Sequence, residues 1–452
     1  MLNKKIPLKR RLLNILALLF ATALLMSMAA CAGQASAQQP ASTAAGTAGA
    51  AQTDVKPPVE LIFWYCFTDK IQENNVNLAE KFNETRGKEM NIHVTAEYQG
   101  SYDELHQKLQ AAHVAKDVPS VTVMEIASIK TFAENNVILP LTSYINRDAV
   151  DVGDFFPGLM INCRVGDDLY GLPYLRSTPI MYLNATLLKA AGLDPKGPQT
   201  WDEFAHYCRT VKEKTGAYGM SMYSYIWTFE AFMLASGSHT VTADETKSNI
   251  NTPEAKEALS FYQGLIDEGV IRCVAGADSA KVTADQMNQN CAMWYWSTAN
   301  LTQNLAIAEE NGFELNVCFF PENKSRGVPT GGCNLIMTAL QSDDEKEASW
   351  QFIKWMTEPE QAAYAHLYTG YVPSRKAAAE SPEVQEKYKE FPQFGVALEQ
   401  LGLYGHGRPM NPGYAQASVE MVGIMDAIWV NDADIDSTVT AAEPIINQML
   451  AR

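Results

Sequence analysis

The amino-acid sequence predicts two α/β lobes, the first of them built on a parallel, doubly wound sheet. Two observations support this fold class. Segments with strand periodicity alternate with segments of helical periodicity over short connections, and the same alternation returns after Pro173. Residues 59–452 also number 394, which exceeds what one hydrophobic core usually organises. We therefore expect a second lobe to begin near residue 176.

The first lobe is predicted from a run of short periodic segments. Residues 59–66 are continuously apolar and aromatic, which is typical of a strand buried on both faces. A helix with one apolar face follows, and apolar and polar residues then alternate over 91–98 as in a second strand. Ser101 and Glu104 form a capping box that opens another helix, and residues 121–124 make a third strand.

The second lobe repeats this pattern. Residues 180–183 are predicted to form a strand, and Thr200 with Glu203 makes a second capping box, heading a helix that ends at Gly216. The last third of the chain is mostly helical, with an amphipathic helix over 345–356.

The N-terminus has the layout of an export signal, with five basic residues before an apolar run over 12–28. The run ends in Met28, two alanines and Cys31, which resembles a bacterial lipobox. The resemblance implies that residues 1–30 are removed and that a lipid on Cys31 anchors an extracytoplasmic protein. The alternative is an ordinary secreted protein. Residues 31–58 hold few large apolar side chains, so we expect a flexible tether with a reach of about 30 Å.

Composition excludes several classes of partner. Residues 1–30 contain five basic and no acidic residues, so their removal changes the net charge from −17 to −22. Such an acidic surface argues against nucleic acid and anionic lipid as partners. The cysteines that remain are odd in number, and the sequence has no CxxC pair and no HExxH motif, so no metal or other cofactor is expected.

One acidic segment has the spacing of a calcium loop. Asp432, Asp434, Asp436 and Glu443 stand at the positions of its ligands, but Ser437 replaces the glycine that the turn needs. We therefore expect an acidic loop before the last helix, with Asp436 as the helix cap.

Nine stretches of the chain resemble, in order, the extracellular solute-binding proteins of bacterial ABC importers, in their carbohydrate branch. The resemblance implies a periplasmic-binding-protein-like fold in which the ligand binds a cleft between two discontinuous lobes. It places residues 59–175 and 298–341 in lobe 1 and residues 176–297 and 342–452 in lobe 2. It also implies a monomer that has the permease subunits of an importer as its partners. The stretches are LIFWY, YQGSYDELHQKLQAA, PSVTVMEIAS, LRSTPIMYLNATLLKAAGLDPKGPQTWDEF, CAMWYWSTANL, PTGGCNLIM, KEASWQFIKWMTEPEQAAY, GYVPSRKAA and RPMNPGYAQASVEM.

Three candidate binding residues follow from the strand pattern alone. Trp64, Tyr102 and Glu125 stand at or just after the carboxyl ends of predicted strands, where open parallel sheets bind ligands. Aromatic faces beside a carboxylate suit a sugar or polyol. The alternatives are core burial for Trp64 and a solvated loop carboxylate for Glu125.

Further candidates are implied by the resemblance. Trp201 matches a position that faces the cleft, with a hydrophobic staple as the alternative. Trp227 and Trp296 belong to aromatic-rich segments of the second lobe and the hinge. Gly332 would let a ligand approach the backbone, with an ordinary turn as the alternative. The chain is expected to cross between lobes near two serines, and a tyrosine hydroxyl is expected to donate to the ligand; these residues are Ser177, Ser297 and Tyr371.

Arg408 bears on the class of ligand. The stretches YQGSYDE, VMEIAS and TGYVPSR most resemble glycerol-3-phosphate-binding proteins, in which a basic residue is expected in the helix after a Gly-Asn-Met-Pro segment. Here Ala417 and Ser418 stand near that place, which puts phosphate recognition in doubt. Arg408 could substitute for the missing base, or it could be a surface charge.

The sequence thus favours an importer's binding protein for a carbohydrate-type solute. The alternatives are the same role for glycerol-3-phosphate or a glycerophosphodiester, and a lipoprotein glycosidase. An enzyme is not expected, because a glycosidase needs two carboxylates around one bond, and only Glu125 is singled out. A surface adhesin would not require aromatic residues that converge at strand ends.

Overall fold

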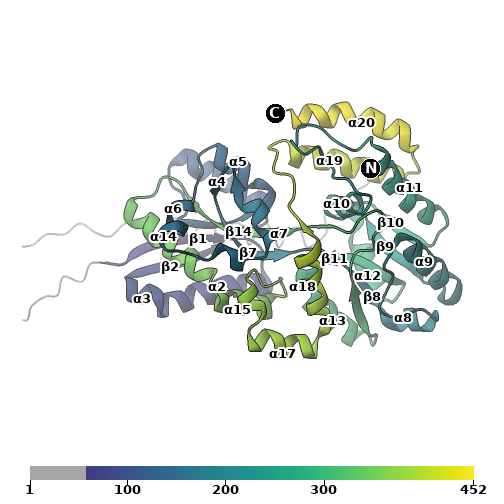
Figure 1. Ribbon diagram of the computed structural model, residues 1–452, viewed down its shortest axis with the longest axis horizontal. Helices are drawn as coiled ribbons and strands as arrows, with labels where there is room; N and C mark the ends of the chain where they lie inside the picture. Colours follow the sequence, from purple (N-terminus) through teal and green to yellow (C-terminus); the bar gives the residue numbers. More distant parts are fainter. Residues whose placement is uncertain (1–56, 452) are drawn as a thin grey trace, which may run out of the picture. The chain divides into compact units, whose positions relative to one another are not determined.

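The computed structural model describes residues 57–451, which contain two larger β-sheets (Figure 1). The expected signal segment over 1–30, Cys31 and nearly all of the tether expected over 31–58 lie outside the described residues. The first sheet has the order β2-β1-β3-β14-β4, with β7 paired to β14. Its strands are β1 (Val59–Tyr65), β2 (Ile92–Tyr98), β3 (Val121–Glu125), β4 (Ile138–Leu139), β7 (Leu172–Ser177) and β14 (Gly331–Thr338).

Helices cover both faces of this sheet. On one face β1 packs against α2 (Asp69–Glu84) and α14 (Asp343–Met356) in a core that includes Phe63 and Phe352. On the other face Met124 of β3 packs with Leu109 of α4 (Tyr102–Ala115) and Phe132 of α5 (Ile129–Glu134). Because β1, β2 and β3 are parallel, their carboxyl ends share one edge, as expected. The sheet is nevertheless mixed and not wholly parallel, because β14 is antiparallel to β3, β4 and β7.

The second sheet has the order β10-β9-β11-β8-β12. Strand β9 pairs in parallel with β10 and β11, and β8 is antiparallel to both β11 and β12. The strands are β8 (Pro179–Asn184), β9 (Tyr218–Tyr223), β10 (Ile271–Val274), β11 (Cys291–Ser297) and β12 (Leu315–Cys318).

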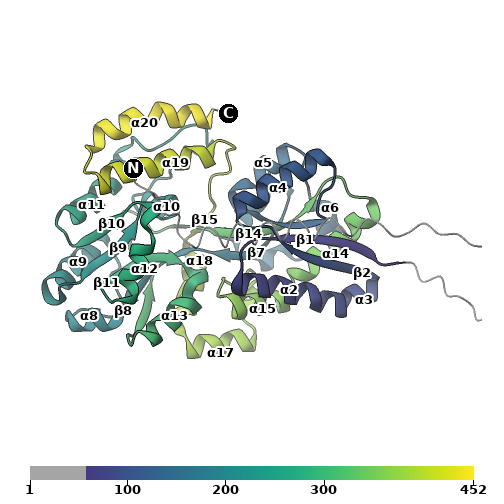
Figure 2. The same cartoon turned by 180° about the vertical axis from the view of Figure 1, so that it is seen from behind.

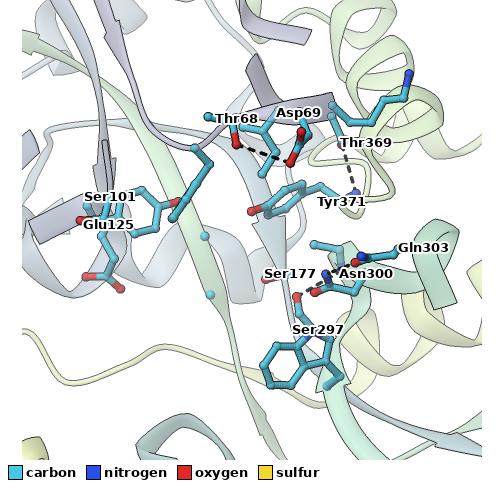
Figure 3. A pocket seen from close by; sticks show the side chains of 18 of the residues that line it. Thr68, Asp69, Ser101, Glu125, Ser177, Ser297, Asn300, Gln303, Thr369 and Tyr371 are labelled. Carbon is cyan, nitrogen blue, oxygen red and sulfur yellow. Dashed lines mark hydrogen bonds between the residues drawn. The ribbon is translucent and has the colours of Figure 1, made fainter. Parts of the chain in front are cut away.

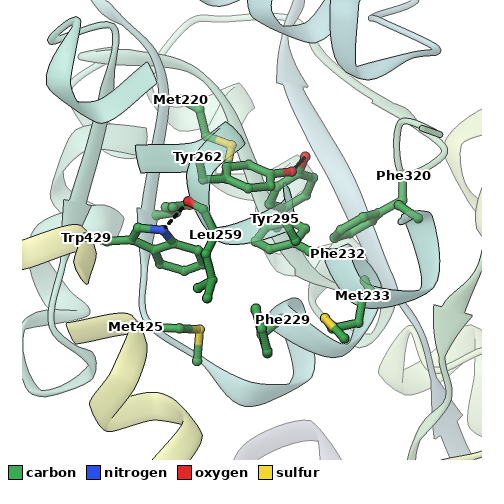
Figure 4. Packing of buried hydrophobic residues seen from close by; sticks show 14 of the residues in the cluster. Met220, Phe229, Phe232, Met233, Leu259, Tyr262, Tyr295, Phe320, Met425 and Trp429 are labelled. Atoms are coloured by element: carbon green, nitrogen blue, oxygen red, sulfur yellow. Dashed lines mark hydrogen bonds between the residues drawn. The ribbon is translucent and has the colours of Figure 1, made fainter. Parts of the chain in front are cut away.

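One face of the second sheet is covered by an aromatic core (Figure 4). Phe232 stacks on Tyr262 at 3.9 Å between ring centroids, and Tyr295 stacks on Phe320 at 4.1 Å. The two tyrosine hydroxyls in this core pair with each other, 3.1 Å apart. The helices on this face are α9 (Trp201–Thr215), α10 (Ile226–Ala235), α11 (Pro253–Asp267), α19 (Tyr414–Met425) and α20 (Ile435–Leu450), the last two lying over α10 and α11 in Figures 1 and 2.

The chain passes between the sheets more than once. It leaves the first sheet after β7 and enters the second at β8, with Thr178 between them. It returns through β13 (Val328–Pro329), which leads into β14 and pairs in parallel with β15 (Gly405–His406). It leaves again beyond α15 (Pro359–Thr369), since α18 (Pro392–Tyr404) packs with β12.

Two of the expected lobe segments are corrected by this packing. Part of 298–341 lies with the second sheet, because α13 (Leu301–Glu310) packs on its outer face and β12 is one of its strands. Part of 342–452 lies with the first, because Phe352 of α14 contacts Phe63 and Phe82, with ring centroids 5.4 and 5.1 Å apart. Periodicity identifies the buried face of a helix but not the sheet that covers it.

Local capping follows the sequence closely. Ser101 and Glu104 form the expected capping box at α4. Thr200 caps α9, although the Glu203 carboxylate accepts from the Gln199 amide and not from that of Thr200. The cap of α20 is Asp434, not Asp436 as expected, because its Oδ1 accepts the Ser437 amide proton at 2.9 Å.

Residues 57–451 hold no metal-binding cluster, membrane-spanning helix or disulfide. Over this range no group of three or more His, Cys, Asp or Glu side chains is arranged to hold a metal ion. No helix of this range has both the length and the apolar character needed to cross a membrane. The cysteines in the same range are all free thiols: Cys66, Cys163, Cys208, Cys273, Cys291, Cys318 and Cys333.

Candidate functional site

A cavity of about 1040 Å³ lies at the carboxyl edge of the first sheet and is lined by residues from both sheets. This volume lies just above the usual range of small-molecule sites, about 300–1,000 Å³. Figure 3 shows Ser101 and Glu125 on one side of it and Ser297, Asn300 and Gln303 on another. It brings together nine of the predicted residues: Tyr102, Glu125, Ser177, Trp227, Trp296, Ser297, Gly332, Tyr371 and Arg408.

Trp64 and Trp201 do not line the cavity, which corrects both predictions. Trp64 is half-buried on β1, where its Nε1 donates to Glu97 Oε2 at 3.0 Å. The edge at the end of β1 is instead formed by later residues, including Asp69. Trp201 is 5 % exposed and stacks on Phe261 at 4.4 Å. Its place in the first turn of α9 therefore reflects burial in the second core.

The first-sheet wall is built from residues that follow strands. Glu125 ends β3, and its Oε2 accepts the Ala127 amide proton at 2.9 Å, which fixes the carboxylate at the cavity. Tyr102 begins α4 directly after the Ser101 cap and packs edge-on against Phe67 at 4.9 Å. Burial raises the pKa of Tyr102, so its hydroxyl stays protonated.

The second-sheet wall supplies the larger aromatic faces. Trp296 and Ser297 end β11, and Trp296 lies 5.5 Å from Tyr223 between centroids. Trp227 is in the first turn of α10, and its Nε1 donates to the Thr330 carbonyl at 3.2 Å. The hydroxyl oxygen of Ser297 accepts the Ala299 amide proton. This bond caps the turn that ends at Asn300, directly before α13.

Glycine is required at position 332 for a different reason from the one expected. Its φ is +90°, and a Cβ there would lie 1.9 Å from the Leu175 carbonyl oxygen of β7. Glycine is therefore required by the close approach of β7 and β14, where their register shifts. At Gly331 a Cβ would lie 2.7 Å from the Trp227 ring, so this glycine makes room for a cavity residue.

Tyr371 is held by the chain just before it. The His366 ring Nδ1 lies 2.6 Å from the Tyr371 carbonyl oxygen, and the Thr369 hydroxyl accepts the Tyr371 amide proton at 3.2 Å. Burial raises the pKa of Tyr371, which leaves its hydroxyl a neutral donor or acceptor.

Arg408 is the centre of an ion-pair network and not a surface charge. Its Nη1 donates to Glu125 Oε1 at 3.1 Å, its Nε to Glu230 Oε2 at 2.9 Å, and its Nη2 to Glu230 Oε1 at 3.1 Å. Tyr414 also donates to Glu230, at 2.6 Å. Burial lowers the pKa of Arg408, but Glu230 and Glu125 together reverse the effect, so the guanidinium stays charged. Burial raises the pKa of Glu125, which Arg408 opposes.

Sequence reasoning missed Glu230, Asn300 and Gln303. Glu230 is the one charged residue in the apolar helix α10, IWTFEAFMLA, and is 5 % exposed. A lone carboxylate in such a helix indicates a buried partner, so the signal was present. Asn300 and Gln303 line the cavity directly after the hinge serine, where no sequence pattern distinguishes them from ordinary helix residues.

The sequence is similar to a known family of bacterial binding proteins. A model of the bacterial extracellular solute-binding proteins matches residues 77–393. The sn-glycerol-3-phosphate-binding periplasmic protein UgpB of Escherichia coli O1:K1 is 23% identical over 413 residues, which is 86% of this chain and 92% of the relative.

Two solved structures share the fold. The cyclic α-maltosyl-1,6-maltose-binding protein of Arthrobacter globiformis matches with a TM-score of 0.76 and 22% identity, over 87% of this chain and 99% of its own. UgpB of Mycobacterium tuberculosis, in complex with glycerophosphocholine, matches with a TM-score of 0.75 and 24% identity, over 87% and 98%. The chain thus shares its two-lobe fold with both of these proteins.

Proposed function

The chain belongs to the family of bacterial extracellular solute-binding proteins, and from this premise we propose that it delivers a neutral, carbohydrate-type solute to an ABC importer. The solute would bind in the cavity between the two sheets. Closure of the two lobes around it would signal occupancy to the permease subunits. The protein would act as a monomer and need no cofactor.

The observation that supports this ligand class is the compensation of Arg408. Among the described residues that line the cavity, the basic side chains are Lys70 and Arg408. Lys70 is paired with Glu73 at 3.0 Å, and Arg408 with two carboxylates. A phosphate would find the buried Arg408 already paired, with only the exposed Lys70 near the rim, whereas a neutral ligand needs no cation.

The rest of the lining suits a polyhydroxylated molecule. Trp227 and Trp296 offer aromatic faces for the C–H patches of a sugar ring. Glu125, Asn300 and Gln303 offer acceptors and amide donors for its hydroxyls. We propose these five as ligand contacts, together with Tyr102, Ser177, Ser297, Gly332 and Tyr371.

A thermal-shift screen tests the proposal. A ligand that binds the folded state alone raises stability by mass action, so neutral sugars and polyols should raise the Tm. Their phosphates should raise it less at the same concentration. The proposal fails if no sugar or polyol raises the Tm while an unrelated class of solute does.

A second candidate is the same role for glycerol-3-phosphate or a glycerophosphodiester. The named ligands of two of the similar proteins favour it. In that case the phosphate would have to displace a carboxylate from Arg408. The same thermal-shift screen separates the two, since glycerol-3-phosphate and glycerophosphocholine would then give the largest shifts.

We also propose that the protein is lipid-anchored through Cys31, on the outer face of the cell membrane. The lipobox-like sequence before Cys31 supports this. A Cys31→Ser variant should leave the membrane fraction. The anchor is refuted if that variant stays membrane-bound and unprocessed.

Binding without turnover is expected. A glycosidase would need two free carboxylates around one bond, and Glu125 already accepts from Arg408. Prolonged incubation with a sugar that raises the Tm should return it unchanged. Recovery of a hydrolysed sugar would revive the glycosidase alternative, with Glu125 as the residue to test.

A further inference from the structure

Glu230 holds the cavity's arginine from the side away from the ligand space. It is 5 % exposed, it is absent from the cavity lining, and both of its oxygens accept from Arg408. Tyr414 donates to it at 2.6 Å, and the Tyr414 hydroxyl lies 2.9 Å from Thr240 Oγ1. The carboxylate therefore accepts from three donors, the Nε and Nη2 groups of Arg408 and the Tyr414 hydroxyl, which hold it against the guanidinium.

The backbone of Arg408 is fixed as well. Its amide donates to Asn162 Oδ1 at 2.9 Å, and its carbonyl accepts from Asn162 Nδ2 at 2.8 Å. The guanidinium consequently stays between Glu230 on one side and Glu125 on the other. All three of its nitrogens donate to a carboxylate.

These charges make the binding of an anion in the cavity unfavourable. The Arg408 side chain is 15% exposed, so water screens this network weakly. The Glu230 charge alone balances the guanidinium, and any charge on Glu125 adds to the negative side. An incoming phosphate would meet the guanidinium on its cavity side, where it would compete with Glu125 for the Nη1 group and be repelled by that carboxylate.

We propose that Glu230 is a specificity-determining residue that makes the cavity reject anionic solutes by keeping Arg408 compensated. Arg408 in turn holds Glu125 oriented as an acceptor for ligand hydroxyls. This inference rests on the proposed function, because it names the charge class of the solute for that same cavity. Loss of the Glu230 charge should convert the cavity into a phosphate site.

The test is a gain of binding in Glu230→Gln. The amide keeps the size of the side chain and one acceptor oxygen but removes the charge. Calorimetry with sn-glycerol-3-phosphate and with inorganic phosphate should give affinities roughly tenfold or more above those of the unaltered protein. The gain should shrink as salt rises, since it depends on an uncompensated charge. A variant that is only misfolded cannot give this result.

Glu245→Gln is the matched control. Glu245 accepts from the Met410 amide at 3.0 Å, two residues from Arg408, but makes no contact with the guanidinium. Its substitution should leave phosphate binding unchanged. If Glu230→Gln does not fold, Glu125→Gln removes the other carboxylate and should raise phosphate affinity in the same direction.

Two outcomes overturn the inference. One is tight, micromolar binding of glycerol-3-phosphate by the unaltered protein. The other is a folded Glu230→Gln variant that binds phosphate no better than the unaltered protein or the Glu245→Gln control. Either result leaves the importer role in place, whereas the failure of every sugar and polyol to raise the Tm would refute the proposed function separately.

Discussion

Two arginines near the cavity differ in what surrounds them. Arg176, on β7, is fully buried and donates to neutral acceptors alone: the Gly331 and Leu159 carbonyls, Asn334 Oδ1 and Thr330 Oγ1. Arg408 donates to the carboxylates of Glu125 and Glu230. Burial lowers the pKa of Arg176, whereas the carboxylates raise that of Arg408. The comparison shows that the neighbours of a buried cation, and not its burial, decide its role.

Arg176 joins the strands at the crossing between lobes, and its loss should have the largest effect. Arg176→Met would remove the arginine's hydrogen bonds to four buried acceptors. We expect the free energy of unfolding to fall by about 3–5 kcal/mol, measured by urea denaturation. A loss under about 1 kcal/mol would contradict the structural role of these bonds.

The stability lost by the same substitution at Arg408 should be partly restored by a second substitution. Arg408→Met leaves the buried Glu230 carboxylate with the Tyr414 hydroxyl but without a counter-ion, and we expect the free energy of unfolding to fall by about 2–4 kcal/mol. Adding Glu230→Gln should restore about half of it, because the uncompensated charge is then gone. The free energies of unfolding of the two single variants and the double variant give the coupling. Strict additivity would mean that Arg408 is not stabilised by this pair.

The tryptophans extend the comparison from charge to apolar contact. Trp296→Ala should weaken the binding of a sugar by about 1.5–3 kcal/mol in calorimetry, since a ring face is lost. Trp201→Ala is the contrast, because Trp201 stacks on Phe261 in the core. It should lower stability and leave sugar affinity unchanged in the folded fraction. Equal losses of affinity would contradict the assignment of Trp201 to the core.

His366 is a third buried base, and like Arg176 it contacts a neutral acceptor, the Tyr371 carbonyl. Burial lowers the pKa of His366 to about 4, below its ordinary value of 6.5. The unfolded chain thus binds more protons between these values, so stability is full above pH 6.5 and falls as the pH drops towards 4. The free energy of unfolding should be about 1 kcal/mol lower at pH 5.5 than at pH 6.5 because of this residue.

His366→Gln should flatten that profile. The slope will not vanish, because burial also lowers the pKa of His106 to about 4. The exposed His93→Gln variant controls for the loss of a surface histidine. An unchanged slope in His366→Gln would show that this ring is not the group being titrated.

The sequence predicted those features that depend on local pattern. The Ser101 capping box and strands β1 to β3 follow from residues close in the chain, and Tyr102 and Glu125 reach the cavity because they stand at strand ends. The same reasoning was wrong for Trp64, since a residue at a strand end can still point along the face of the sheet.

Features that depend on distant partners could not be predicted in the same way. The partner sheet of α14 depends on Phe63 and Phe82, far away in the chain. Glu230 and Arg408 are 178 residues apart in the chain. The apolar helix around Glu230 therefore predicts that Glu230 is buried, but not which residue it pairs with. A missing base at Ala417 and Ser418 suggested a neutral ligand, and the carboxylates that neutralise Arg408 give that suggestion a physical basis.

The most direct measurement uses a matched pair of ligands on the unaltered protein. It is a calorimetric titration with the neutral sugar that raises the Tm most, and with the phosphate ester of that same sugar, at low and high salt. We expect the neutral sugar to bind at least roughly tenfold more tightly, with an affinity nearly independent of salt. Tighter binding of the ester, weakening as salt rises, would contradict the account of Arg408 as a compensated cation.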